Sequence, residues 1–432
     1  MENVYHSGIR RSIRMTQTCF RALQNLFFMK SSELKNSFKN HSNCLWMEIV
    51  LRRLGKWNKF VVGLWFLLRL IILARFSHMT GIFIWTFVAE DDYEYIFLVH
   101  TVTYLMFYNY IQVVLLRFSY QDLTAIRIFF NARSYHKQDP EAHRIRCAAY
   151  QKSNWAVLGP LSMWIFMWTS MVVTGVYKWR VVNIDPETMA SYPLLQEIVQ
   201  NVYQMQHLIV AGWHQLPTVI INSILFGFIA ELKILTYSCD KIIENAEAAV
   251  EKARSQSESV DTEVLFWKHC KMELNTRVKA NATILTNLIN LRQMLKPVLL
   301  LSYYLLLMVN AFIISSVQNG YFSTYGPCGI LMTVYLNIDF GIVCYNMSKV
   351  DDLCSKVGER IYNLPWPHKL TKSDRFAREY RSIRSTMIVM MMRAQAGMAF
   401  SCGRFYEMSM EKIAELMKLT YTMVMFVLQV QE

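Results

Sequence analysis

Long stretches without a charged side chain limit what this chain can fold into. Residues 95–116 and 155–177 contain no charge, and residues 297–338 form a longer uncharged run interrupted by turn-forming residues. A helix needs about 20 predominantly apolar residues to cross the roughly 30 Å hydrocarbon core of a bilayer. A soluble helix of that length normally keeps one polar face in water. The pattern therefore predicts an all-α membrane protein.

Hydropathy and basic residues together predict the topology. We place seven helical spans at residues 60–88, 95–116, 155–177, 198–230, 298–318, 328–348 and 405–428. Most of the 45 lysine and arginine residues lie in segments 1–59, 117–152, 231–280 and 349–393, which alternate onto one side of the membrane. Because basic loops stay in the cytosol during insertion, we expect a cytosolic N-terminus and an extracellular C-terminus.

The segments between the spans define the expected organisation. Residues 1–59 are predicted to form a cytosolic N-terminal segment, and residues 60–348 hold the first six spans. Within that region, residues 231–280 mix basic and acidic side chains, as expected of cytosolic helical extensions of spans four and five. Residues 349–398 are predicted to form a cytosolic anchor region, and residues 399–432 the last helix. The amphipathic stretch of the anchor either packs on neighbouring helices or forms an assembly surface between subunits.

Composition and motifs argue against several function classes. The net charge of +13 fits a cytosolic rim facing anionic lipid headgroups, so we expect membrane lipid and no nucleic acid as a partner. The nine cysteines include no CxxC pair, and neither a metal site nor a cofactor is expected. No paired catalytic residues stand at a useful spacing, which argues against an enzyme.

The last predicted span differs from the others because it carries charge. Only residues 419–431 are free of charged side chains, which is too short to cross a bilayer. The helix must therefore include Glu411, Glu415 and Lys418, which share one face at i, i+4 and i+7. Charge at membrane depth is costly unless it meets water or a partner. This face either lines an aqueous path or is neutralised by salt bridges from Glu411 or Glu415 to Lys418.

Short motifs near the C-terminus resemble those of the insect odorant receptors. Tyr362 and Trp366 form a Tyr-x-x-x-Trp element, residues 403–405 read Gly-Arg-Phe, and residues 420–422 read Thr-Tyr-Thr before an apolar run. Val427 stands where the related gustatory receptors carry glutamine, which favours the odorant branch. The chain lacks the longer insertion between spans four and five that is typical of the common co-receptor, so it resembles an odour-specific subunit.

The resemblance implies a function and a set of partners. It implies an odorant-gated, non-selective cation channel subunit that binds a small volatile. It also implies a heterotetramer with the olfactory co-receptor, in the plasma membrane of olfactory sensory neurons. The alternatives are a gustatory-type channel and a seven-helix G-protein-coupled receptor. The second is disfavoured because such receptors place the N-terminus outside, and because no Asp-Arg-Tyr or Asn-Pro-x-x-Tyr element ends a span here.

Candidate functional residues follow from depth, chemistry and the resemblance. Aromatic and thioether side chains usually pack in a core, but they also build apolar ligand cavities. We expect the ligand pocket in the outer half of spans two, three, four and six, with candidates His100, Tyr104, Met167, Met171, Tyr203, His207 and Tyr335. The gate of the family maps onto Val424 and Leu428. Thr420, Glu415 and Glu411 are expected near the same face, Gln429 becomes the more polar neighbour on opening, and Tyr362 and Trp366 are assembly candidates.

Overall fold

The computed structural model describes the greater part of the chain. The described residues are 93–132, 135–136, 138–173, 192–256, 261–318, 326–366, 370, 374–403 and 406–431, with 77, 80, 81 and 84. The predicted N-terminal segment and most of the first predicted span lie outside these residues.

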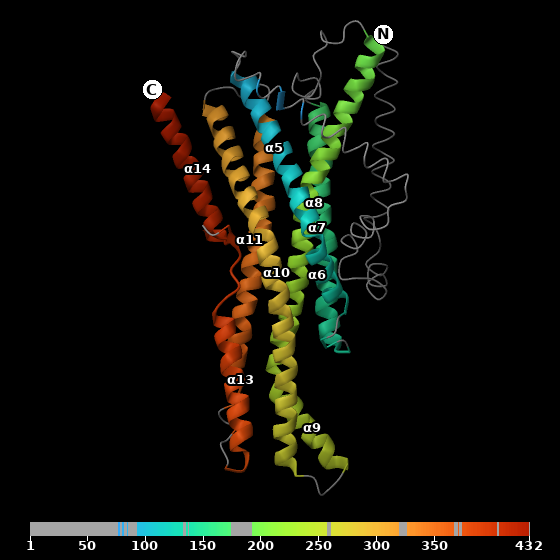
Figure 1. Cartoon of the computed structure of the whole chain (residues 1–432), viewed down its shortest axis with the longest axis vertical. Helices are drawn as coiled ribbons and strands as arrows, with labels where there is room; N and C mark the ends of the chain where they lie inside the picture. Colours follow the sequence, from blue (N-terminus) through green and yellow to red (C-terminus); the bar gives the residue numbers. More distant parts are fainter. Residues whose placement is uncertain are drawn as a thin grey trace.

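Long helices run along the longest axis of the molecule (Figure 1). They are α5 (Tyr93–Phe118), α7 (Pro140–Val173), α8 (Pro193–Asp240), α10 (Thr262–Gln318) and α11 (Gly326–Tyr362). The short helix α6 (Tyr120–Ala132) follows α5. The prediction of an all-α fold is confirmed, because the described residues form helices apart from one small hairpin.

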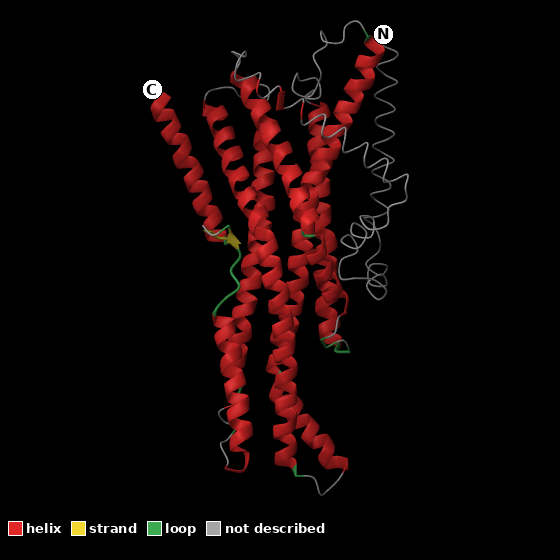
Figure 2. Ribbon diagram, in the orientation of Figure 1, coloured by secondary structure: helices red, strands yellow, loops and turns green. Residues whose placement is uncertain are grey.

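The two ends of the long axis carry different elements. Helices α9 (Ile242–Gln256) and α13 (Ala377–Gln395) lie at one end, and α14 (Met410–Gln431) reaches the other (Figure 1). The 3-10 helix η3 (Asp374–Phe376) precedes α13. A two-stranded antiparallel hairpin, β1 (Ser401–Cys402) and β2 (Tyr406–Glu407), connects α13 to α14 near the middle of the molecule (Figure 2).

Helices α5, α7, α8, α10 and α11 are longer than the spans predicted from hydropathy. Among the described residues, Pro217–Asp240 and Thr262–Ala311 are long and apolar enough to cross a membrane by length and composition. The mixed-charge segment 231–280 is occupied by the end of α8, by α9 and by the start of α10. Hydropathy underestimates the lengths of these helices. A helix can extend beyond the membrane as long as one of its faces packs against neighbouring helices.

The apolar core follows α8, α10 and α11. Ile224, Leu225 and Phe228 of α8 are fully buried, as are Leu288 and Leu291 of α10. Beside them, the ring of Phe130 from α6 meets the ring of Phe228 edge to face, with centroids 4.9 Å apart. Gly227 permits this contact, since a Cβ there would lie 2.6 Å from the Phe130 ring. These contacts place α6 against the C-terminal third of α8.

Candidate functional site

The last helix packs on its own chain along one stripe. α14 contacts α10 and, less extensively, α11. Leu416 and Thr420, one turn apart, are each 1% exposed. The Thr420 hydroxyl donates to the Leu416 carbonyl oxygen at 2.9 Å, so it needs no other partner in this apolar contact. Thr420 therefore faces the body of the chain.

A polar stripe covers the opposite face of α14. Glu411, Glu415, Lys418, Thr422 and Gln429 are all exposed in the single chain. At about 100° per residue, Glu411 lies roughly opposite Thr420 on the helix. The prediction that Thr420 shares a face with Glu411 and Glu415 is therefore wrong, because five and nine residues are not near-integral numbers of turns.

The charges on this stripe are paired differently from the predicted salt bridges. Lys412 Nζ lies 2.6 Å from Glu415 Oε2, so the ion pair shown here uses Lys412 rather than Lys418. Both partners are exposed, and pairs of this kind contribute little to stability. The stripe itself is thus polar and mixed in charge, and apolar side chains such as Met425 and Phe426 are exposed beside it. The side chains of the predicted gate residues Val424 and Leu428 lie outside the described residues.

Side-chain contacts of Asn310 connect α10 to α11 and to α14. Asn310 of α10 is 3% exposed. Its amide exchanges two hydrogen bonds with Asn337 of α11, at 2.7 and 3.2 Å. The Asn310 Nδ2 atom also lies 3.8 Å from the sulfur of Met417 in α14. The last helix is therefore linked to the two helices on which it packs.

Further polar contacts join α5 to α10 and α8 to α11. The Tyr108 hydroxyl of α5 lies 2.8 Å from Ser302 Oγ of α10, and Gln112 donates to the same oxygen at 3.2 Å. Asp339 of α11 is hydrogen-bonded by Thr218 of α8. Each pairing satisfies a polar group that would otherwise be costly among apolar side chains.

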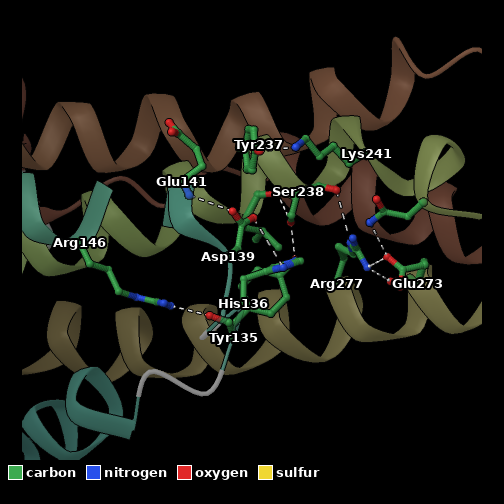
Figure 3. A network of polar contacts seen from close by, with 12 residues as sticks. Tyr135, His136, Asp139, Glu141, Arg146, Tyr237, Ser238, Lys241, Glu273 and Arg277 are labelled. Atoms are coloured by element: carbon green, nitrogen blue, oxygen red, sulfur yellow. Dashed lines mark hydrogen bonds and ion pairs between the residues drawn. The ribbon is translucent and has the colours of Figure 1, made fainter. Parts of the chain in front are cut away.

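A buried network of polar contacts joins α7, α8 and α10 toward the other end (Figure 3). Arg146 donates to both carboxylate oxygens of Glu231 at 2.6 and 2.7 Å, and to the carbonyl oxygen of Tyr135 at 2.8 Å. Arg277, 1% exposed, pairs with Glu273 and donates to the Ser238 carbonyl oxygen. Burial raises the pKa of Tyr135 to about 12, so its hydroxyl, which is hydrogen-bonded to Ser238, stays protonated.

A cleft of about 180 Å³ opens beside this network. Its lining includes the Phe129 ring, Tyr135, Glu231 and Lys279. The Glu231 carboxylate is already neutralised by Arg146. None of the residues that line the cleft is among the predicted ligand-pocket candidates. Among the described residues no group of three or more His, Cys, Asp or Glu side chains is placed to hold a metal ion.

Comparisons with known proteins identify the family. The family model for the 7tm odorant receptors matches residues 92–421, most of the chain. The chain belongs to the odorant receptor family. Odorant receptors of this family are membrane receptors and ligand-gated channels rather than enzymes. Among curated proteins there is no match.

Solved odorant receptor structures share the fold. The insect olfactory receptor OR5 from Machilis hrabei matches with a TM-score of 0.57 at 12% identity, over 84% of this chain and 88% of that chain. The same receptor in complex with eugenol matches with a TM-score of 0.65 at 12% identity, over 93% and 99%. At this identity the likeness establishes the arrangement of helices.

The described residues cover only part of the pocket predicted for this odorant receptor. Tyr335 of α11 is partly buried and packs against the core, whereas Tyr104 of α5 is 42% exposed. Both belong to helices that contact α10. The side chains of the other candidates, namely His100, Met167, Met171, Tyr203 and His207, lie outside the described residues.

The two assembly candidates of the odorant receptor are placed differently. Tyr362, at the end of α11, is 69% exposed. Trp366 packs against the apolar core, although its indole Nε1 is buried without a hydrogen-bond partner in the described part of the chain. Tyr362 is therefore available at the surface, and Trp366 supports the bend after α11.

The network at the α6–α7 connection predicts a pH-dependent stability for this receptor. Burial, and then the nearby Arg277, lower the pKa of His136, with smaller effects of Asp139, Glu273 and Arg146. A folded-state pKa below the unfolded value means that stability is fully present above about pH 6.5 and declines as the pH falls toward the folded pKa. We expect acidification to lower the thermal-inactivation temperature of the purified receptor.

A matched variant isolates the contribution of His136. Its backbone has a φ of 47°, in the left-handed region that asparagine tolerates. His136→Asn should therefore keep the loop and flatten the acid part of the stability curve. Equal pH dependence in parent and variant would assign the acid sensitivity to other groups.

Proposed function

We propose that this chain is an odour-specific subunit of an odorant-gated, non-selective cation channel. The observation that carries the proposal is the polar exposed stripe on α14, opposite the stripe buried against α10 and α11. A charged face on a membrane-spanning helix requires water or a partner. An aqueous pore shared between subunits meets that requirement. It would offer cations the carboxylates of Glu411 and Glu415, the second of which pairs with Lys412 in the single chain.

The proposed assembly is a tetramer with the common co-receptor in the plasma membrane of olfactory sensory neurons. In this assembly seven spans cross the bilayer, with a cytosolic N-terminus and an extracellular C-terminus. The end that carries α9 and α13 is then cytosolic, which agrees with the lysine and arginine residues of segments 231–280 and 349–393. We propose that the anchor region 349–398, with Tyr362 exposed on it, contributes to subunit contacts.

The proposed ligand is a small aromatic or aliphatic volatile held within the membrane. One solved relative was captured with eugenol, a ligand of that chemical kind. Apolar burial at about 25 cal/mol per Å² would supply most of the binding free energy, and one hydrogen bond would orient the molecule. Tyr104 and Tyr335 offer hydroxyl groups for that bond.

Voltage clamp of cells expressing this chain tests the function directly. Currents should follow a subset of a broad odour panel when the chain is expressed with the co-receptor, and should be absent when the co-receptor is expressed without it. Tags at both ends, read without permeabilising the cells, separate this topology from that of a G-protein-coupled receptor. Odour responses that need no co-receptor but require a G protein would overturn the proposal.

Alanine substitution tests the proposed pocket. Tyr335→Ala and Tyr104→Ala should shift the odorant dose–response curve to higher concentration, because each removes contact area and a hydroxyl. The loss of one neutral hydrogen bond, about 1 kcal/mol, corresponds to roughly a fivefold shift. Alanine at four or more of the seven candidates without any shift would place the pocket elsewhere.

A further inference from the structure

Asn310 and Asn337 form a closed pair of hydrogen bonds in apolar surroundings. Each amide both donates to and accepts from the other, and Asn337 Nδ2 also donates to the Thr333 carbonyl oxygen at 2.8 Å. The buried neighbours along the two helices include Leu306, Leu307, Val309, Leu336 and Phe340. Asn310 is 3% exposed and Asn337 is partly buried, so breaking the pair would leave the Asn310 amide in apolar surroundings without its partner, which favours the formed pair over partly broken arrangements.

The pair lies between the proposed pocket and the last helix. Tyr335, a proposed ligand contact, precedes Asn337 by two residues on α11. On the other side, Asn310 Nδ2 contacts Met417, three residues before the buried Thr420 of α14. Three helices thus meet at this pair of side chains. Tyr335, the proposed ligand contact, lies within one helical turn of Asn337, and Thr420 lies within one turn of Met417.

We propose that Asn310 and Asn337 are positioning residues that transmit ligand-induced movement of α11 to the last helix. The inference rests on the proposed channel function. A small shift of α11 on ligand binding moves Asn337 and, through the hydrogen bonds, the side chain of Asn310. The contact of Asn310 with Met417 then changes, and with it the position of α14. An element with two discrete arrangements, biased from both sides, is the physical requirement for coupling between sites.

A double-mutant design separates this role from a merely structural one. Asn337→Leu alone leaves the buried Asn310 amide without its amide partner, and Asn310→Leu alone leaves Asn337 with its bond to the Thr333 carbonyl oxygen. Replacing both by leucine of similar shape removes the unpaired groups. Each single variant should lower the number of receptors at the cell surface, and the double variant should restore it. If the pair transmits gating, maximal odorant current per surface receptor in the double variant should fall about fivefold or more, the lower range of allosteric coupling.

The chain offers a matched control pair. Asn346 of α11 donates to Asn222 of α8 at 2.9 Å, and both are buried, so this pair joins α11 to α8 rather than to α10. The double leucine variant of this pair should match the parent in current per surface receptor. An equal loss in both double variants, or parent-like current in the Asn310 and Asn337 double variant, would overturn the proposal.

A second variant guards against failure to fold. Met417→Leu removes the sulfur contact with little change in packing volume and should also reduce current per surface receptor. If the double variant does not reach the surface and Met417→Leu conducts like the parent, the pair is structural only. Failure of the channel function itself is distinguishable, because the parent chain with co-receptor would then give no odorant current.

Discussion

Arg146→Met should sharply reduce the amount of folded receptor. The substitution leaves Glu231 buried without its bidentate partner, since the two side chains are 3% and 6% exposed. It also removes the donor to the Tyr135 carbonyl oxygen. Breaking a buried ion pair by removing one partner costs about 3–5 kcal/mol. Surface labelling of intact cells and thermal inactivation in detergent should both report the loss.

Two controls give the prediction its specificity. Arg144 pairs with Glu141 at the surface, and Arg144→Met should change stability little because water screens that pair. The double variant Arg146→Met with Glu231→Met should recover part of the loss, since no unpaired charge remains buried. A double variant as unstable as Arg146→Met alone would show that the contact to Tyr135 matters more than the charge pair.

Val424→Ser and Leu428→Ser should raise the resting leak of the assembled channel. In the proposed closed state these positions of the last helix form an apolar constriction that excludes water. Because nine residues separate Val424 from Glu415, the proposal requires the last helix to present a different face to the pore at the level of the gate than at the level of the acidic side chains. Losing about 1.5 kcal/mol of apolar burial there raises the resting open-to-closed ratio roughly tenfold. The increase in leak should be smaller than tenfold in a heterotetramer, because co-receptor subunits supply the other residues of the constriction. The odour rank order should not change, because the pocket is untouched.

Leu419→Ser is the matched control for the gate. Nine residues separate Leu419 from Leu428, which places them on opposite faces of α14, and Leu419 is 41% exposed. The control should therefore leave the leak unchanged. Parent-like resting currents in both gate variants, together with cysteines at these positions that resist thiol reagents in the open channel, would show that this face does not line the pore.

Much of the fold follows from local patterns in the sequence. The uncharged runs predict helices of membrane-spanning length, and the structure places helices over the described parts of those runs. Residues 420–422 and the other short motifs near the C-terminus indicated the family that the family model matches over residues 92–421. Both signals are local, because they depend on the composition and order of neighbouring residues.

The faces of the last helix show where local reasoning fails. The spacing of Glu411, Glu415 and Lys418 predicts that they share one face, and all three side chains are exposed. Thr420 was assigned to the same side, although helical geometry places it opposite, where the structure buries it at 1% exposure. Only packing against α10 and α11 decides which of the two faces is turned inward.

Neighbouring residues specify the helical class, the lengths of the apolar segments and the family. Which polar groups meet depends instead on how the helices pack. Arg146 and Glu231 are 85 residues apart, and Asn310 and Asn337 are 27 apart on different helices. Such pairs depend on the rotation and relative height of packed helices. A hydropathy profile does not predict the rotation or the relative height of two helices. Several ways of packing them bury the same apolar stripe.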